Sequence, residues 1–543
     1  MVKRIGGGFG GKETLSIYRA GAIAVAAAKT KRAVRLVIDR DEDMSISGQS
    51  HPFEGKWTVG FDGTGKLLAA DVQLTNDAGQ SICCSNVVMD RGVAHWVNAY
   101  HFGAVRVTGK LAHTHLPGNT AFRGFGVPQS ALICEDMLEA VAASLGHSNA
   151  DAVRKINLMP ATGSHTPYGQ LVEPCHAPRV VSELSASSDL VRRRLAIAAF
   201  NAKHKWRKRG LALIPTCYGV NFPLRYLNQA SAQVLVYTDG TVLLTHSAVE
   251  MGQGVNIKMI QVAAQVFGIA ADAVHIAECA SDRCINTSPT AASVGADLNG
   301  MATLHGCEQI LERLAPLYQE FPDATFADIC KKAYKRQISL ASTGFYASPY
   351  GGVHDWRSCA DAVEGAVRSL DSNVSRGDIF NYFAFGAACA EVELDVLTGL
   401  FVVVRADILM DVGHSLNPAI DIGQVEGAFV QGMGRWTMEE ICFSSTGAMT
   451  TSNPHTYYIP TSADVPRDMR ITLLGDAPSP TAVHSSKAVG EPPFFLSSCV
   501  FFALKEAIHA ARKDNGLTGH FRVDAPATSH RIRMACRDGK VLP

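Results

Sequence analysis

Hydrophobic and polar positions follow two different periods along this chain, and the period predicts which segments are strands and which are helices. From Gln233 to His246 apolar residues alternate with polar ones on both sides of Asp239-Gly240, the pattern of a β-hairpin. From Ile133 to Leu145 they are spaced as on one helix face. The remaining segments predict helices over Glu13–Lys29, from about Asn256, after Gly427 and over Phe494–Arg512, a buried strand over Ala33–Asp39, and strand pairs over Gly55–Val72 and Ala388–Val412.

Proline and glycine interrupt these patterns at Pro160, Gly163, Pro167 and Gly169. Such a cluster stops helices and strands and is typical of a segment between two units. We therefore predict a first unit over residues 1–160, a linker over 161–205 and a second unit over 206–543.

The composition limits the classes of partner. Of 543 residues, 47% are hydrophobic and 18% charged, and 50 basic side chains balance 50 acidic ones. The chain therefore has no global field that attracts nucleic acid or an anionic membrane. The basic runs 203–209 and 331–336 are better explained as solvated faces. Near the start, the apolar run Ala20–Ala28 is too short to cross a bilayer, and no secretory signal is present. We expect no nucleic-acid and no membrane partner.

Cysteine and histidine usage argues against a protein-bound metal. The 14 cysteines include no C-x-x-C pair, and the adjacent Cys83 and Cys84 come nearest to a cluster. This pattern favours reduced thiols and disfavours zinc or iron–sulfur ligation by this chain. His113 and His115 are better explained as polar strand surface than as metal ligands. We expect a cytoplasmic protein, with a peroxisomal location as the alternative.

A glycine-rich loop near the start is the first candidate for binding chemistry. Five of the six residues from Gly6 to Gly11 are glycine, with Phe9 between them, and Glu13 follows. Glycine lets the backbone take positive φ or lie against a ligand, and loop N–H groups bind electron-rich groups. The stretch also fits the dinucleotide pattern G-x-G-x-x-G, with Asp39 as the later acid, but only residues 1–5 are available for the strand that this pattern requires.

Further loops of this kind recur along the chain and offer amides, hydroxyls and Arg123 rather than metal ligands. Such a site suits a large polar organic cofactor. Glu13 and Glu491, in loops at opposite ends of the chain, suit a substrate-orienting carboxylate and a general base. The further loops are Asn119–Gln129, Glu250–Gly254, Ser288–Ser293, Gly423–Gly427 and Lys487–Pro493.

Six motifs stand here in the order found in the molybdenum hydroxylases: Gly-Gly-Gly-Phe-Gly-Gly-Lys-Glu, Thr-Ala-Phe-Arg-Gly-Phe-Gly, Glu-Met-Gly-Gln-Gly, Ser-Pro-Thr-Ala-Ala-Ser, Asp-Ile-Gly-Gln-Val-Glu-Gly and Lys-Ala-Val-Gly-Glu-Pro-Pro. The chain resembles the xanthine dehydrogenase/oxidase branch of that family over nearly its whole length. The resemblance implies the C-terminal molybdopterin-binding region only, an α+β fold of two molybdopterin-binding domains with mixed sheets and packed helices, truncated at its N-terminus. It also implies a molybdenum–molybdopterin cofactor without a protein ligand to the metal.

The resemblance implies roles for single positions. Glu491 matches the catalytic base, which removes a proton while an electron-poor ring carbon is hydroxylated. Phe125 and Phe222 match two rings that sandwich a flat heterocycle. The positions matched to the substrate are Glu13, Arg91, Phe125, Phe222 and Pro223. Those matched to the cofactor are Phe9, Gly10, Arg123, Met251, Gly252, Gln253, Ala292, Ser293 and Gln424, with Phe9, Arg123 and Ala292 around the molybdenum.

Glu13 and Arg91 match the pair that separates purine hydroxylases from aldehyde oxidases. A purine offers ring nitrogens and carbonyls to both groups, whereas an aldehyde leaves them unpaired at a cost of several kcal/mol. We therefore predict hydroxylation of hypoxanthine to xanthine and of xanthine to urate, with an aldehyde oxidase-type activity as the alternative. Pro223 stands where a threonine is usual and Arg225 where a small or apolar residue is usual, and both bear on substrate range.

The complete enzymes that the chain resembles carry more than this region. The resemblance implies 2Fe-2S clusters, FAD and NAD bound elsewhere in such an enzyme, and a homodimer. Because this chain encodes none of those domains, an inactive fragment remains an alternative to a catalytic portion.

Overall fold

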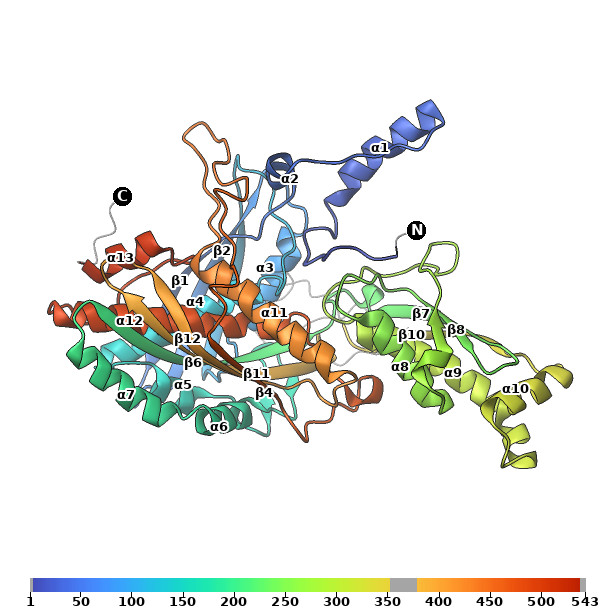
Figure 1. The fold of residues 1–543 in the computed structure, drawn as a ribbon. Coiled ribbons are helices and arrows are strands. Elements are labelled where there is room, and N and C mark those ends of the chain that lie inside the picture. The colour runs from blue at the N-terminus through green and yellow to red at the C-terminus, as the bar shows by residue number, and fades with distance from the viewer. Residues whose placement is uncertain (1–2, 352–377, 538–543) are drawn as a thin grey trace.

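The computed structural model describes residues 3–351 and 378–537, and these form an α+β architecture of sheets packed against helices (Figure 1). The helices are α1 (Ser16–Thr30), α2 (Arg40–Ile46), α3 (Ser85–His95), α4 (Val127–Ser144), α5 (Asp151–Asn157), α6 (Ala177–Ser187), α7 (Leu190–Lys203), α8 (Val255–Phe267), α9 (Gly295–Glu320), α10 (Phe326–Lys335), α11 (Pro418–Thr437), α12 (Ser498–Asp514) and α13 (Ser529–Arg537), with 3-10 turns η1 (Arg225–Leu227), η2 (Ala271–Ala273), η3 (Val483–Ser485) and η4 (Pro492–Ser497). The strands are β1 (Phe53–Phe61), β2 (Leu67–Gly79), β3 (Ala104–His113), β4 (Ser164–His165), β5 (Leu171–Val172), β6 (Arg207–Val220), β7 (Gln229–Val236), β8 (Val242–His246), β9 (Val274–Ile276), β10 (Ala341–Ala347), β11 (Tyr382–Asp395), β12 (Phe401–Met410) and β13 (Asp468–Leu473).

The first sheet has the order β1-β2-β3, with β1 antiparallel and β3 parallel to β2. The predicted turn at Asp62-Gly63 is confirmed, because the Asp62 N–H donates to the Lys66 carbonyl at 3.0 Å. Helices α3 and α4 contact this sheet. Gly109 in β3 allows the close approach of α3, since a Cβ there would lie 2.5 Å from Met89 Cγ.

The sheet β13-β12-β11-β6 is buried on both faces and separates two hydrophobic cores. Alternate residues of β6 enter different cores: Ala212 and Ile214 join the core that contains α12, while Leu211 and Leu213 join the core that contains α6. The segment Pro492–Asp514, which includes α12, is long and apolar enough to cross a membrane, but 83% of its apolar window is buried inside the protein. That burial is typical of a core helix.

The third sheet, β10-β7-β8-β9, packs against α8 and α9 on the right of Figure 1. The predicted hairpin is confirmed as β7 and β8, closed by the Gly240 N–H donating to the Tyr237 carbonyl at 3.0 Å. The predicted helices near residues 13–29, 133–145, 256 and 494–512 and the strand pair at 388–412 are also present, as α1, α4, α8, α12 and β11–β12.

The prediction of a buried strand over Ala33–Asp39 is wrong. These residues form an irregular segment after α1, in which Val37 is 72% exposed and Leu36 49% exposed. Helix α1 has no buried residue and projects from the rest of the protein (Figure 1). A strand requires a neighbour that pairs with its backbone, and within the described residues no strand pairs with this segment.

The basic run 203–209 is not a solvated face throughout, which corrects the prediction from charge. Lys208 is 1% exposed, and its Nζ donates to the Asn201 carbonyl at 2.7 Å and pairs with Asp514 at 2.5 Å. Arg209 pairs with Glu391 and Glu393 at 3.2 and 2.8 Å. These partners lie far away in sequence, so the charge run alone did not reveal them.

Candidate active site

The glycine loops that lie far apart in sequence come together in the structure. A Cβ on Gly8 would lie 3.0 Å from Met251 Sδ, and one on Gly10 would lie 2.6 Å from the Ala121 carbonyl oxygen. Gly10 has φ +98°, which only glycine adopts readily. The Ile5 N–H donates to the Glu250 carbonyl at 3.0 Å. The first loop therefore packs against both the second and the third.

Arg123 ties three segments into one site. The guanidinium donates through Nε to the Gly490 carbonyl at 2.7 Å, and through Nη2 to the carbonyl and side-chain oxygens of Gln424, both at 3.2 Å. Nη1 donates to Gln431 Oε1 at 3.3 Å, and the ring of Phe9 lies 5.9 Å away. Burial lowers the pKa of Arg123 to about 10, opposed by the nearby Glu491. Arg123 thus remains a cation at neutral pH.

Glu491 is held by donors on both carboxylate oxygens. The Gly124 N–H donates to Oε1 at 3.1 Å, and the Ser293 hydroxyl donates to Oε2 at 3.1 Å. The Glu491 N–H in turn donates to the Ser293 hydroxyl at 2.9 Å. These contacts fix the orientation of a partly exposed carboxylate, which is what a general base requires.

Glu13 is near enough to Glu491 for their charges to interact. Withdrawal from bulk water, with smaller contributions from the negative charges of Glu491 and Cys83, raises the pKa of Glu13 to about 7. The residue is nevertheless accessible to solvent, so a ligand can reach it. Near neutral pH, Glu13 changes between a neutral donor and an anionic acceptor.

We expect the pH dependence of purine turnover to report this titration. The predicted role of Glu13 is to accept hydrogen bonds from purine ring N–H groups when it is ionised, so kcat/KM for hypoxanthine should fall as the pH is lowered through about 7. Glu13→Gln, which cannot ionise, should remove this limb of the profile. A profile measured from pH 5 to 9 that is unchanged in the variant would contradict the assignment.

Arg91 in α3 is buried and holds the chain that leads to Phe222. Its guanidinium donates to the carbonyls of Gly219 and Asn221 at 2.5 and 2.8 Å and lies 4.8 Å from the centre of the Tyr218 ring. Its Nε is buried without a hydrogen-bond partner among the described residues. Arg91 therefore retains a donor for a further acceptor.

The two predicted aromatic residues, Phe125 and Phe222, lie next to backbone groups that Glu491 and Arg91 bind. Phe125 follows Gly124, whose N–H binds Glu491, and has φ +51°, which is uncommon for a bulky residue. The backbone N–H and carbonyl of Phe222 both bind the side chain of Asn228, at 2.9 and 2.8 Å. Pro223 and Arg225 lie within the turn that Asn228 closes. The stacking of a substrate between the two rings remains a prediction.

The start of α8 follows the glycine loop Glu250–Gly254, but its backbone N–H groups are not free to bind an anion. The Glu250 carboxylate accepts the N–H groups of Gly252, Gly254 and Asn256 at 2.9, 3.1 and 3.1 Å. The Gln253 side chain is likewise bound within its own loop, to Met251 and Val249. Roles of Met251, Gly252 and Gln253 toward a cofactor remain predictions.

The glycines around these loops fit a flat cofactor. A Cβ added to any of four of them would meet nothing within 4 Å, so the backbone can be approached closely; they are Gly6, Gly252, Gly423 and Gly427. Ala292 and Ser293 have successive positive φ angles of 52° and 59°, which are uncommon for non-glycine residues. The prediction of a loop over Gly423–Gly427 is wrong, because these residues lie inside α11, where Gln424 contacts Arg123. The exposed backbone and the polar groups of these segments therefore suit a ligand that is held by many weak polar contacts.

Two alternatives from the sequence lose support. No described strand precedes Gly6, and Asp39 immediately precedes the short helix α2, so the dinucleotide-binding unit is absent from the described residues. No group of three histidine, cysteine or acidic residues in the described chain could hold a metal, and His113 and His115 are exposed at the end of β3.

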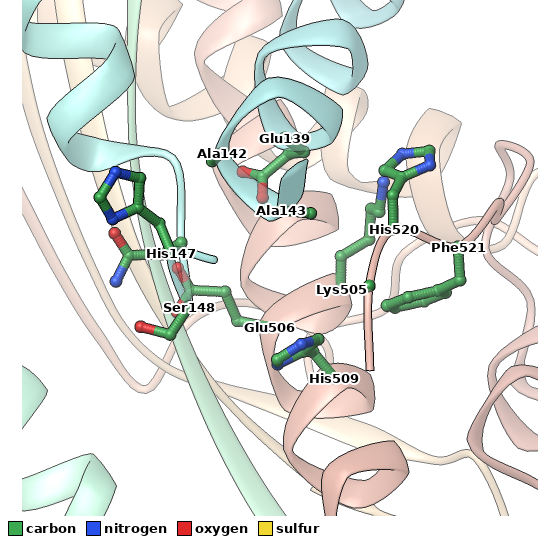
Figure 2. A pocket seen from close by; sticks show the side chains of 12 residues that line it. Glu139, Ala142, Ala143, His147, Ser148, Lys505, Glu506, His509, His520 and Phe521 are labelled. Atoms are coloured by element: carbon green, nitrogen blue, oxygen red, sulfur yellow. The ribbon is translucent and has the colours of Figure 1, made fainter. Parts of the chain in front are cut away.

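A cavity between α4 and α12 is separate from these loops. Figure 2 shows Glu139 on α4 facing Lys505, Glu506 and His509 on α12, with His520 closing one side. Its volume is about 30 Å³. Ligand sites usually have several hundred Å³, so this cavity holds no substrate.

Several residues of the site were not predicted from the sequence. Gln431 accepts a hydrogen bond from Arg123, and Asn228 closes the turn after Phe222. The ring of Tyr218 contacts the guanidinium of Arg91. Each is an ordinary polar or aromatic residue inside a helix, turn or strand, so no local signal marks it.

The comparisons agree with the converging loops. The family described as the molybdopterin cofactor-binding domain matches twice, at residues 1–158 and 183–466. The chain is 47% identical over 541 residues to a xanthine dehydrogenase of Dictyostelium discoideum, covering 100% of this chain and 39% of that protein. It is 47% identical to a xanthine dehydrogenase/oxidase of Gallus gallus, covering 99% and 38%. The chain therefore spans about two fifths of the length of these curated relatives.

A solved structure shows the same fold at lower identity. Quinoline 2-oxidoreductase from Pseudomonas putida 86 superimposes with a TM-score of 0.83 at 22% identity, covering 99% of this chain and 68% of that one. The converging glycine loops, the two family matches and this superposition all indicate a cofactor-binding fold of one kind. The chain belongs to the molybdopterin cofactor-binding domain family of the molybdenum hydroxylases.

Proposed function

We propose that this chain carries the substrate-hydroxylating site of a purine hydroxylase of the xanthine dehydrogenase type. The observation that supports it most is the convergence of Glu491, Glu13 and Arg123, which come from three distant loops. The relatives named xanthine dehydrogenase share 47% identity with the whole chain.

In this proposal each side chain has one task. Glu491, oriented by Gly124 and Ser293, takes a proton during hydroxylation. Glu13 orients the purine through ring N–H groups, and Arg91 stabilises negative charge that develops on the heterocycle. Phe125 and Phe222 hold the flat ring between them, and such contacts contribute roughly 0.5–1.5 kcal/mol beyond burial.

The molybdenum cofactor, when bound, accepts the pair of electrons released as the carbon is hydroxylated. Phe9, Gly10 and Arg123 would border it on one side. The loops at 251–253 and 292–293, together with Gln424 on α11, would hold its pterin and phosphate. The proposal extends to the complete protein: 2Fe-2S clusters, FAD and NAD as electron carriers, a homodimer, and a cytoplasmic location.

The test uses the complete protein that contains this chain, with its molybdenum content measured first. Stoichiometric molybdenum and turnover of hypoxanthine and xanthine support the proposal. Turnover of an aromatic aldehyde without purine turnover would support the aldehyde oxidase-type alternative instead. Absence of molybdenum from the complete protein would contradict the proposal, and absence from this chain purified alone would support the inactive fragment.

We expect Arg91→Met to lower kcat/KM for purines by roughly 10–100-fold, because a charge-assisted hydrogen bond is worth about 1.5–3 kcal/mol. Turnover of a small aldehyde should fall much less. The matched control is Arg313→Met on α9, since that guanidinium also donates to two backbone carbonyls, those of Gln309 and Ala341. Equal losses for purine and aldehyde would show that Arg91 only supports the fold.

A further inference from the structure

Two adjacent cysteines lie beside the residues assigned to the substrate. Cys83 and Cys84 stand between β2 and α3, and Cys83 is exposed while Cys84 is half-buried. Cys83 has φ +40°, an uncommon conformation for a side chain of its size. None of the roles considered so far uses either thiol.

Hydroxyl groups from two other segments meet these sulfurs. Thr14 Oγ1 lies 3.2 Å from Cys83 Sγ, and Thr120 Oγ1 lies 3.2 Å from Cys83 Sγ and 3.8 Å from Cys84 Sγ. Hydrogen bonds from Cys84 and from the two threonines lower the pKa of Cys83 to about 5, although burial opposes them. Cys83 is therefore exposed to solvent, and its hydrogen bonds favour the thiolate, which is the reactive form of cysteine.

The thiolate is close to Glu13. Thr14, which contacts Cys83 Sγ, directly follows Glu13, and the charge of Cys83 contributes to the raised pKa of that carboxyl. Glu491 acts on the same carboxyl. Glu13 thus has the base of the reaction and the Cys83 sulfur as near neighbours.

We propose that Cys83 is a covalent modification site for soft electrophiles, and that a group attached there blocks the purine from Glu13. The position of the purine rests on the proposed function, whereas the reactivity of the thiolate does not. With a maleimide, Cys83 Sγ bonds to one alkene carbon, the carbon–carbon double bond becomes single, and the other carbon takes a proton from water. The step requires no oxidant.

The first test measures the reactivity alone. The complete protein is treated with limiting N-ethylmaleimide at pH 7, and labelling of each cysteine peptide is followed by mass spectrometry. Cys442 is the internal reference, because it is partly exposed and burial raises its pKa. Cys83 should label at least about threefold faster, because it is more exposed and its pKa is lowered whereas that of Cys442 is raised, although a thiolate of lower pKa is a weaker nucleophile. Equal rates would overturn the proposal.

The second test measures the position. Hypoxanthine should slow the labelling of Cys83 but not of Cys442, and purine turnover should fall in proportion to the labelled fraction.

Cys83→Ser should retain turnover and become insensitive to the reagent. Cys84→Ala should slow labelling of Cys83, because it removes the hydrogen bond that contributes most to the thiolate. Rapid labelling without purine protection, in protein that turns over purines, would overturn the position of the site. Absence of purine turnover with rapid labelling would count against the proposed function alone.

Discussion

Glu491→Gln should lower kcat for purine hydroxylation by about 10²–10⁴-fold, the usual contribution of a positioned general base. The amide keeps the size of the side chain and can still meet Gly124 and Ser293, so the loop should retain its structure. Turnover should be lost because no carboxylate remains to take the proton. Since the loop keeps its structure, molybdenum content and purine binding should be preserved. Steady-state kinetics and metal analysis of the same preparation check this result.

Glu426→Gln provides the matched control. Glu426 lies two residues after Gln424 on α11 but is exposed, and it has no role in the proposed reaction. Its variant should turn over purines at the wild-type rate. Wild-type turnover in Glu491→Gln would refute the base, and loss of molybdenum would assign Glu491 to cofactor retention instead.

Lys487→Met should destabilise the protein by about 3–5 kcal/mol, the usual cost of leaving a buried charge without its partner. Lys487 Nζ lies 2.6 Å from Asp411 Oδ2, and the two side chains are 4% and 0% exposed. Asp411 also binds His176 Nδ1 at 3.0 Å. Lys487 begins the loop that ends at Glu491, so turnover should fall together with stability. Urea unfolding midpoints of the two proteins measure the change.

Two further variants separate charge from packing. Lys331→Met removes an exposed pair with Asp328 and should change stability by less than about 1 kcal/mol. Combining Lys487→Met with Asp411→Leu removes both charges and should recover part of the loss. If Lys487→Met alone is as mild as Lys331→Met, the buried pair does not hold the loop.

The pH dependence of stability follows from the same cluster. Burial alone would raise the pKa of Asp411, but hydrogen bonds and charge from His176 and Lys487 lower it below its ordinary value of 3.8. A carboxyl with a lowered folded-state pKa contributes stability above its unfolded value and loses it as the pH falls through the folded one. The contribution of Asp411 is therefore complete at neutral pH and disappears on acidification below about 3.8.

Sequence periodicity predicted the local elements whose partners are near in the chain. The hairpin at Asp239-Gly240 and the helix at 133–145 need only their own turn chemistry and apolar spacing, and both are present. The strand at Ala33–Asp39 failed because strand formation depends on a neighbour that the segment itself does not specify. Lys208 failed for the same reason, since its partner Asp514 lies at the far end of the chain.

The candidate site was visible in the sequence only as separate loops. Their glycines show where a backbone is unusual, but no physical rule gives the distance between Gly8 and Met251 or between Gly124 and Glu491. Only the resemblance of the motifs, in their order, to those of the molybdenum hydroxylases predicted that these loops come together. Contacts made by ordinary residues, such as Asn228 with Phe222, remained hidden because an asparagine in a turn has many commoner explanations.

The hydrogen bond between Gly124 and Glu491 joins residues 367 positions apart. This separation affects how quickly the candidate site forms during folding. Closing so long a loop adds little to the equilibrium cost, since each doubling of length adds only about 0.6 kcal/mol. The delay it imposes is larger, because distant contacts form slowly. The contact between Gly124 and Glu491 should therefore form late in folding, and neither half of the polypeptide, synthesised separately, contains both of its partners.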